Sequence, residues 1–268
     1  MNRKEEYLSG CVVLDTETTN IDKEKAEIIE LGIAISDGKK WDSRSDLYKP
    51  KIMPIDPEIS AVTNIVDSMV MDKPHFQDRV ELDLNPIMGF ARDNNGTLLA
   101  HNAPYDYTVV NNYVGVIKIN TPWVCTMRIA KHLFSSDETV KKYNLPYLRY
   151  RFKLDIPDNL EHHRASADAY ITGKLFEHFV DVMIERGMLD DSYPYKSQID
   201  AIAAKPIFIH RVPFGKHMNE SWDKVPKSYM NWAINNLTCL NDTDPLYDSD
   251  LAHTFETVMS KLLENGDI

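Results

Sequence analysis

The sequence lacks cysteine pairs, an excess of positive charge and any long apolar run. Its 268 residues include only three cysteines, Cys11, Cys125 and Cys239, and no C-x-x-C pair occurs. Widely spaced cysteines in odd number argue against a zinc ribbon and against a disulfide framework. We therefore expect a reducing compartment, the cytoplasm.

Positive charge is outnumbered, since 41 Asp and Glu residues face 30 Lys and Arg residues and give a formal net charge of −11. Nucleic-acid-binding modules derive most of their affinity from Lys and Arg on phosphates. The charge balance thus argues against a purely electrostatic DNA-binding module. It leaves open an enzyme that reaches phosphates through bound metal ions.

No apolar stretch is long enough to span a bilayer, so no membrane association is expected. The first six residues include four charged ones and no apolar signal-peptide core follows them, so we expect no signal peptide. The length fits one large domain, or one domain with a small module. Internal repeats and low-complexity tracts are absent from the sequence.

Apolar runs and turn signals predict five strands in an α/β arrangement. The expected strands are 11–15, 27–35, 41–48, 97–102 and 123–126, and the expected helices are 59–71, 76–92, 107–114, 127–134 and 169–188. The dipeptide Asp37-Gly38 predicts a hairpin between the second and third strands. This order gives a mixed five-stranded sheet, flanked by helices, in which the second strand is antiparallel.

The composition changes over residues 189–205, which are rich in Asp, Ser, Tyr, Pro, Lys and Gln. Such a segment is typical of a linker. We therefore expect a main domain over residues 1–188 and a small α+β module over residues 206–268. In that module a short strand is expected at 206–209, a turn at 213–217, and helices at 228–236 and 254–263.

An acidic pair, Asp15 and Glu17, ends the first expected strand. Side chains two residues apart on a strand point to the same face. Neighbouring carboxylates repel each other and stay ionised most readily with a cation between them, and Mg²⁺ or Mn²⁺ prefers such oxygen ligands. A lone D-x-E is more often a strand that runs into a polar turn, so the interpretation depends on the rest of the chain.

Two further aspartates, Asp106 and Asp168, stand at the starts of expected helices. The ends of α/β strands and the helix starts beside them gather at one rim of the sheet. Four carboxylates there can hold two divalent cations roughly 3.5–4 Å apart, which clamp the attacking and leaving oxygens of a phosphodiester. His163 is a suitable base because its unperturbed pKa is about 6.5; His162 is the competing candidate.

Three motifs resemble those of the DEDDh family of 3′→5′ exonucleases, which are DnaQ-like and have the RNase H-like fold. They are D-T-E-T at 15–18, H-N-A-P-Y-D at 101–106 and H-R-A-S-A-D at 163–168. Any one motif is weak, but three in order are a strong signal. The resemblance covers about residues 10–185, with Tyr105 where the family usually has Phe.

The resemblance implies a role for each matching residue. Asp15, Glu17, Asp106 and Asp168 would be the ligands of two Mg²⁺ or Mn²⁺ ions, and His163 the general base. Thr18 and the main chain around it would hold the terminal 3′-hydroxyl, while His101 is expected to buttress the second motif rather than to bind metal. Contacts to the substrate are expected from Thr16, Thr18, Ile21, Ile65, His101 and Asn102.

The loop after the third strand departs from the family pattern. The family commonly has His-Gly-Ile-Thr there, whereas this chain has Thr-Asn-Ile-Val at 63–66. Without the histidine, we expect Ile65 to pack against a base. From its position alone, Ile21 is expected to act as an apolar wedge under the terminal base or pair.

Other stretches resemble the exodeoxyribonuclease X branch of the family, namely 123–127, 170–172 and the tail residues 213–216, 229–232 and 235–236. The resemblance implies hydrolysis of single-stranded or 3′-terminal DNA to nucleoside 5′-monophosphates, and it allows a homodimer. The alternatives are an exoribonuclease of the RNase T or oligoribonuclease type, and a proofreading subunit whose tail binds a polymerase. A non-catalytic nucleic-acid-binding module is disfavoured because all five catalytic-type residues are present.

Three further sequence patterns each allow two interpretations. Residues 141–153 interleave basic and aromatic side chains and form either a contact to the strand or a solvated face. Residues 213–217 form either a simple turn or a contact to nucleic acid or a partner. Trp222, Tyr229 and Trp232 fit core positions better than a stacking platform.

Overall fold

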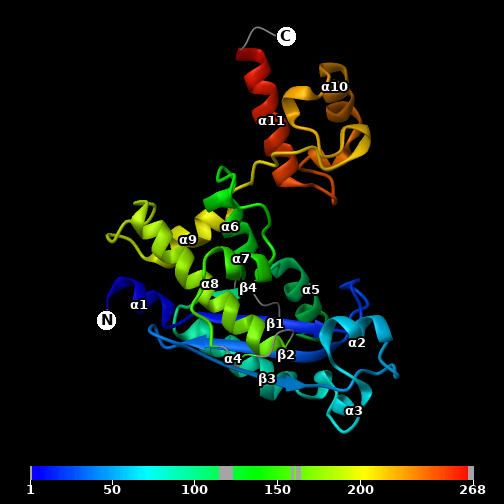
Figure 1. The fold of residues 1–268 in the computed structure, drawn as a ribbon, viewed down its shortest axis with the longest axis vertical. Helices are drawn as coiled ribbons and strands as arrows, with labels where there is room; N and C mark the ends of the chain where they lie inside the picture. The colour runs from blue at the N-terminus through cyan, green and yellow to red at the C-terminus, as the bar shows by residue number, and fades with distance from the viewer. Residues whose placement is uncertain (1, 115–122, 158–159, 161–163, 265–268) are drawn as a thin grey trace. The chain divides into compact units, whose positions relative to one another are not determined.

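The computed structural model describes residues 2–114, 123–157, 160 and 164–264 (Figure 1). The chain divides into two units, residues 1–203 and residues 204–268. Each unit has its own hydrophobic core and is described by itself. Within the described residues, no helix has the length and apolarity needed to cross a membrane.

A five-stranded sheet in the order β3-β2-β1-β4-β5 forms the centre of the first unit. Strand β2 is antiparallel to both β1 and β3, whereas β1, β4 and β5 run parallel. The mixed sheet with an antiparallel second strand is therefore confirmed. The strands are β1 Val12–Thr18, β2 Ile28–Ser36, β3 Trp41–Leu47, β4 Leu98–Ala100 and β5 Trp123–Cys125.

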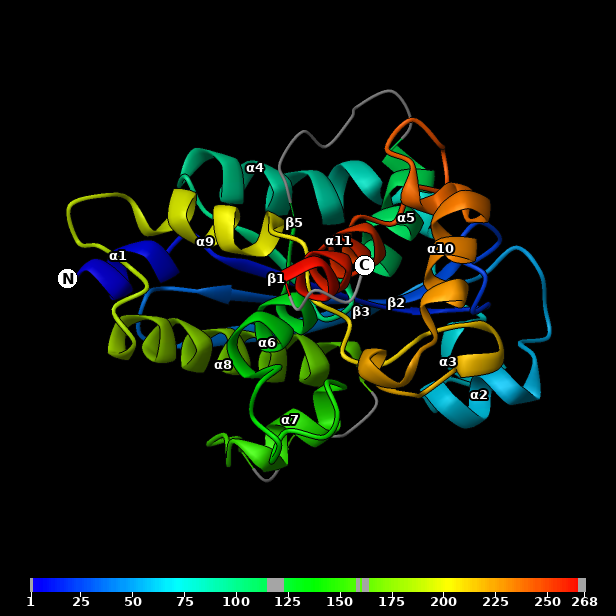
Figure 2. The same ribbon diagram turned by 90° about the horizontal axis from the view of Figure 1, so that it is seen from above.

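Helices cover both faces of this sheet, with α4 on one side and α8 on the other (Figure 2). The helical elements of the first unit are α1 Arg3–Leu8, α2 Pro57–Thr63, α3 Asp67–Val70, η1 Phe76–Asp78, η2 Val80–Leu84, α4 Asn85–Asp93, α5 Ala103–Val114, α6 Thr126–Phe134, α7 Leu145–Arg151, α8 Ala165–Glu185 and α9 Tyr195–Ala204.

The side chains of β1 alternate between two cores. Val13 packs in a cluster with Phe176 and Phe179 of α8, whereas Val12 and Leu14 pack in the cluster on the α4 side. Because the side-chain period of a strand is two, the odd-numbered residues of β1 face α8. The acidic residues that follow at positions 15 and 17 continue this odd-numbered series.

The first turn of α8 lies directly on β2. A Cβ atom added to Gly32 would stand 2.1 Å from both the carbonyl carbon and the carbonyl oxygen of Ala165. The absence of a side chain at Gly32 thus allows the helix to approach the sheet closely. This contact places the start of α8 over the middle of the sheet.

Three segments of the first unit differ from the sequence prediction. The helix expected over 59–71 is split into α2 and α3 at Asn64, which adopts a left-handed conformation with φ 57°. Residues 145–151 form helix α7 instead of a loop, and the side chain of Asn144 accepts a hydrogen bond from the Tyr147 amide. The expected linker 189–205 contains α9, because Tyr195, Ile199 and Ile202 bury their side chains in the core on the α8 side.

The described residues of the second unit form helices and one isolated antiparallel β-bridge, between Arg211 and Ser221, and the strand expected at 206–209 does not form in them. Its elements are η3 Gly215–His217, η4 Trp222–Lys224, α10 Lys227–Asn236, η5 Thr238–Leu240 and α11 Ser249–Glu264. The expected strand at 206–209 is absent because the amides of Ile207 and Ile209 donate to Asp250 Oδ1 (2.9 Å) and Thr254 Oγ1 (2.8 Å) of α11.

We predict that Gly32→Ala lowers the free energy of unfolding by about 2 kcal/mol or more, since the added methyl group would meet the backbone of α8. Gly89→Ala is the matched control. Its Cβ would lie 3.8 Å from Arg92 Nη2, an ordinary van der Waals contact with a flexible side chain, so the substitution should raise stability by about 0.5–1 kcal/mol. Urea titration of both variants measures this, and equal stabilities would contradict the close approach.

Candidate active site

Three carboxylates meet at the end of β1. Asp15 and Glu17 lie on the strand and Asp168 lies in the first turn of α8, and one oxygen from each lies within 4.8 Å of the others. The odd-numbered positions of β1 face α8, so the close approach of that helix brings the three together. The structure thus joins residues that are about 150 positions apart in the sequence.

Asp106 enters the site from α5 and is held by Thr16. Its Oδ1 accepts hydrogen bonds from the Thr16 amide (3.0 Å) and from the Thr16 hydroxyl (2.7 Å). Among the neighbouring charges, Asp106 contributes most to raising the pKa of Asp15. Thr16 was expected to contact substrate; its hydroxyl is instead committed to Asp106.

Burial and mutual repulsion raise the pKa values of these carboxyl groups. Burial, followed by Asp168 and Glu30, raises the pKa of Glu17 to about 8. Burial raises the pKa of Asp106 to about 7 although the hydrogen bonds from Thr16 oppose it, and the pKa of Asp15 is raised well above its usual value. The protein therefore gathers more negative charge here than its own groups neutralise.

This donor set fits a hard divalent cation. The ligand atoms of the cluster are all carboxylate oxygens, with no cysteine or histidine in the group of three. Mg²⁺ and Mn²⁺ prefer oxygen ligands, whereas zinc favours sulfur and imidazole nitrogen. A bound cation would also relieve the repulsion that raises the pKa values.

An ion pair with a fully buried carboxylate fixes the start of α8. Glu30 of β2 is 0% exposed, and its carboxylate accepts hydrogen bonds from Arg164 Nη2 (2.8 Å) and Nε (3.0 Å) and from Ser45 Oγ (2.6 Å). The Ala165 amide, at the beginning of the helix, also donates to Glu30 (3.3 Å). The ion pair thus positions Asp168, which lies in the first turn of the helix. Sequence reasoning did not single out Glu30; the one feature that could have indicated its role is that it is a charged residue within an apolar run.

Thr18 and Tyr105 join the first and second motifs. Their hydroxyl oxygens lie within hydrogen-bond distance of each other and of the Asn20 carbonyl oxygen, which is 3.0 Å from Thr18 Oγ1 and 2.5 Å from the Tyr105 hydroxyl. The two hydroxyl protons supply two of these three hydrogen bonds at a time. The tyrosine that replaces the usual Phe therefore adds hydrogen bonds that phenylalanine cannot make. Thr18 itself is only 7% exposed.

His101 is a structural brace. Its Nδ1 lies 2.8 Å from Thr126 Oγ1 and its Nε2 lies 2.8 Å from the Tyr143 carbonyl oxygen. Burial lowers the pKa of His101 to about 4. This geometry agrees with the expected role of His101 as a support of the second motif. It does not agree with a substrate contact through the ring nitrogens, because both already have protein partners. Asn102 is exposed and turns the chain into α5 with φ 71°.

The two isoleucines expected at the substrate differ in exposure. Ile21 is 89% exposed beyond the end of β1, so its side chain is available to a ligand. Ile65 is 0% exposed and packs with Ile29, Ile55 and Val70. The expectation that Ile65 packs against a base is therefore wrong in this conformation.

The expected base lies outside the described residues. His163, and likewise the competing His162, precede Arg164, where the description of the chain resumes. The role of His163 accordingly remains a prediction from the third motif.

Comparison with known proteins gives a consistent result. An exonuclease family model, RNase_T, matches residues 12–176. Exodeoxyribonuclease 10 of Escherichia coli (strain K12) is 28% identical over 234 residues, which cover 85% of this chain and 92% of that protein. The PolC-type DNA polymerase III of Thermotoga petrophila is 32% identical over 206 residues, which cover 73% of this chain but 14% of the polymerase.

Among solved structures, exonuclease X in complex with 5′-overhanging duplex DNA superposes with a TM-score of 0.54 and 28% identity. The match covers 72% of this chain and 99% of that one. The family model, the relatives and the carboxylate cluster agree with the three sequence motifs. The chain therefore belongs to the RNase_T exonuclease family, the DnaQ-like group of 3′→5′ exonucleases that the motifs indicate.

Proposed function

We propose that this chain is an exodeoxyribonuclease that removes nucleotides from the 3′ end of DNA and releases nucleoside 5′-monophosphates. The observation that carries the proposal is the cluster of Asp15, Glu17 and Asp168, with oxygens within 4.8 Å of one another. The choice of DNA is supported by the likeness to Escherichia coli exodeoxyribonuclease 10 over most of both proteins, and by exonuclease X, whose solved complex holds overhanging duplex DNA.

In this proposal Asp15, Glu17, Asp106 and Asp168 hold two Mg²⁺ or Mn²⁺ ions. When bound, such ions activate the attacking water and stabilise the leaving 3′-oxygen. His163 accepts the proton of the water. Asp106 is oriented by Thr16, and Asp168 is oriented by the anchored start of α8.

Proofreading within a polymerase is a second candidate. It is favoured by the 32% identity to the PolC-type polymerase and by the 26% identity to DNA polymerase III subunit epsilon of Aquifex aeolicus, which covers 73% of this chain and 93% of that subunit. If the tail only tethers the chain to a polymerase, removal of residues 206–268 should leave exonuclease activity on short single strands intact.

The first experiment uses 5′-labelled single-stranded DNA, matched single-stranded RNA and duplex DNA, each with Mg²⁺, Mn²⁺ or EDTA. We expect a ladder that shortens from the 3′ end, fastest on DNA and absent in EDTA. Faster cleavage of RNA would contradict the choice of DNA and indicate an exoribonuclease that uses the same chemistry. Cleavage of no substrate under either metal would contradict both.

We predict that Asp15→Asn and Asp168→Asn each lower kcat by about 10³-fold or more, because a metal ligand supplies several kcal/mol of transition-state stabilisation. In EDTA the same variants should melt at a higher temperature than the parent, since one repelling charge is gone. Asp72→Asn, at an exposed site, is the matched control and should change neither quantity. Near-parental turnover in Asp15→Asn would refute the metal-ligand assignment.

The stability of the metal-free protein should fall as pH rises from about 6.5 to about 8. The pKa values of Glu17 and Asp106 are raised to about 8 and about 7, so the folded state binds more protons than the unfolded state in this range. Burial lowers the pKa of His101 to about 4, so between about pH 4 and 6.5 this group makes stability rise with pH. The pH window chosen here lies above that range.

Thermal melting in EDTA across this window measures the effect, with Asp15→Asn as the control that flattens the dependence. Added Mg²⁺ should reduce the slope, because the ion neutralises the same carboxylates. A melting temperature that rises with pH in EDTA would contradict the repulsion seen in the site.

We predict that His163→Ala lowers kcat by about 10²–10⁴-fold, the usual contribution of a general base. His162→Ala is the adjacent control and should have a much smaller effect. Steady-state hydrolysis of labelled DNA compares the two, and a larger loss for His162→Ala would reassign the base.

A further inference from the structure

The second unit presents an aromatic platform, defined here as Tyr229 and Trp232 of α10 together with Lys216. The rings of Tyr229 and Trp232 are stacked, with centroids 5.4 Å apart and an interplanar angle of 28°. Trp232 is 48% exposed, whereas Trp222, the other tryptophan of the unit, is 6% exposed and lies in its core. The structure thus separates a core tryptophan from a surface one that the sequence pattern did not distinguish.

The ring beneath Trp232 is held in place by residues 214–217. Phe214 stacks on Tyr229 with centroids 6.4 Å apart, and His217 meets the ring at 4.7 Å in a T-shaped arrangement. Gly215 has φ 66°, and a Cβ atom there would stand 2.2 Å from the Tyr229 hydroxyl. The platform is therefore preorganised, so a ligand that stacks on Trp232 need not order Tyr229 first.

Positive charge accompanies the platform. Lys216 Nζ lies 5.3 Å from the centroid of the Tyr229 ring, and no ion pair of Lys216 exists in the part of the chain that the structure describes. Residues 205–227 hold five of the six Lys and Arg residues of the unit and only two acidic residues. Residues 242–256 hold five acidic residues and no Lys or Arg. Lys216 thus belongs to a segment in which basic residues outnumber acidic ones.

An exposed aromatic ring with an adjacent cation suits single-stranded nucleic acid, because every base has a face that stacks and every nucleotide carries a phosphate. We propose that the platform binds single-stranded DNA, with Trp232 stacking on a base and Lys216 facing the phosphate backbone. The choice of DNA rests on the proposed exonuclease function. The platform would hold the strand at a site other than the carboxylate cluster.

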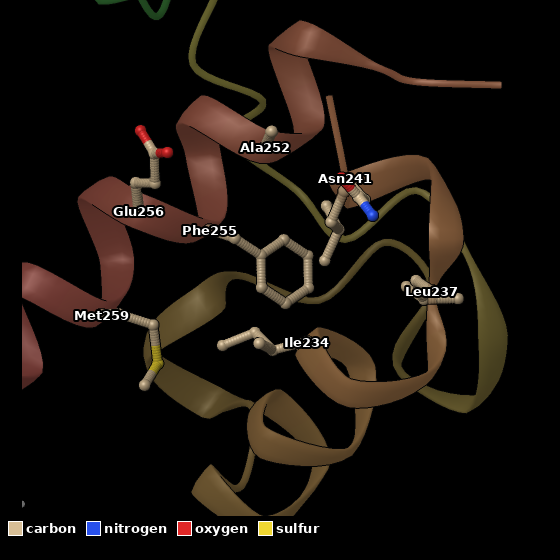
Figure 3. A pocket seen from close by; sticks show the side chains of 8 residues that line it. Ile234, Leu237, Asn241, Ala252, Phe255, Glu256 and Met259 are labelled. Carbon is tan, nitrogen blue, oxygen red and sulfur yellow. The ribbon is translucent and has the colours of Figure 1, made fainter. Parts of the chain in front are cut away.

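A cavity in the same unit supports no comparable assignment. It lies between α10 and α11, has a volume of about 340 Å³ and is mostly apolar, with Ile234, Leu237, Phe255 and Met259 among its lining residues (Figure 3). Glu256 also lines it, which disfavours a phosphate-bearing ligand. The aromatic platform is the feature that carries the inference.

The test measures binding of a fluorescein-labelled oligothymidylate of about 30 nucleotides to the full chain, by fluorescence anisotropy in EDTA, where hydrolysis does not occur. We expect Trp232→Ala to weaken binding about tenfold, within the range for loss of one stacked base, and Trp232→Phe to keep most of the affinity. Lys216→Gln should weaken binding and reduce its dependence on salt.

Two matched controls make the test specific. Tyr247→Ala removes another exposed aromatic side chain, from the acidic segment 242–256, and Lys261→Gln removes another lysine that lies over an aromatic ring, at 5.8 Å from Phe208. Both should bind like the parent. Binding by Trp232→Ala within twofold of the parent, or equal losses in Trp232→Ala and Tyr247→Ala, would overturn the platform proposal.

A separate measurement keeps this inference distinct from the proposed function. Hydrolysis of a nitrophenyl ester of thymidine 5′-monophosphate by the unaltered chain in Mg²⁺ reports on the carboxylate cluster without a long strand. Its failure would count against the exonuclease proposal and leave the anisotropy result standing. Tight binding of RNA but not of oligothymidylate would overturn the choice of DNA.

Discussion

The contact between the start of α8 and strand β2 is the constraint on which the candidate active site depends. Gly32 removes the side chain that would hold the helix away, and the buried Glu30 receives hydrogen bonds from Arg164, Ser45 and Ala165. Without this contact Asp168 would not reach Asp15 and Glu17. The packing of apolar residues against the sheet thus holds together carboxylates that repel one another.

The parts of the site that sequence reasoning predicted are those governed by local periodicity. The alternation along β1 placed Asp15 and Glu17 on one face, and the third motif placed Asp168 in the first turn of a helix. The parts it missed depend on long-range partners. Glu30 and Arg164 are 134 residues apart, and Thr16 and Asp106 are 90 residues apart, so no spacing rule indicates either pair.

Burial explains the wrong predictions better than helix or strand propensity does. Ile65 lies in the core because its neighbours Ile29, Ile55 and Val70 exclude it from solvent, which a motif position alone does not reveal. In the second unit, Ile207 and Ile209 look like a strand, but side chains of α11 satisfy their amides. The five-stranded sheet was predictable because apolar runs mark β1, β2 and β4 and Asp37-Gly38 marks the hairpin between β2 and β3.

The raised pKa values at the carboxylate cluster have a consequence for how a cation enters. Because burial raises the pKa of Asp106 to about 7 and that of Glu17 to about 8, these two carboxyl groups hold protons near neutrality when no cation is bound. A divalent ion that binds here would displace those protons, because ligands coordinate in the deprotonated form. Cation and proton compete for the same oxygens, so acidification alone would act as an inhibitor of metal loading.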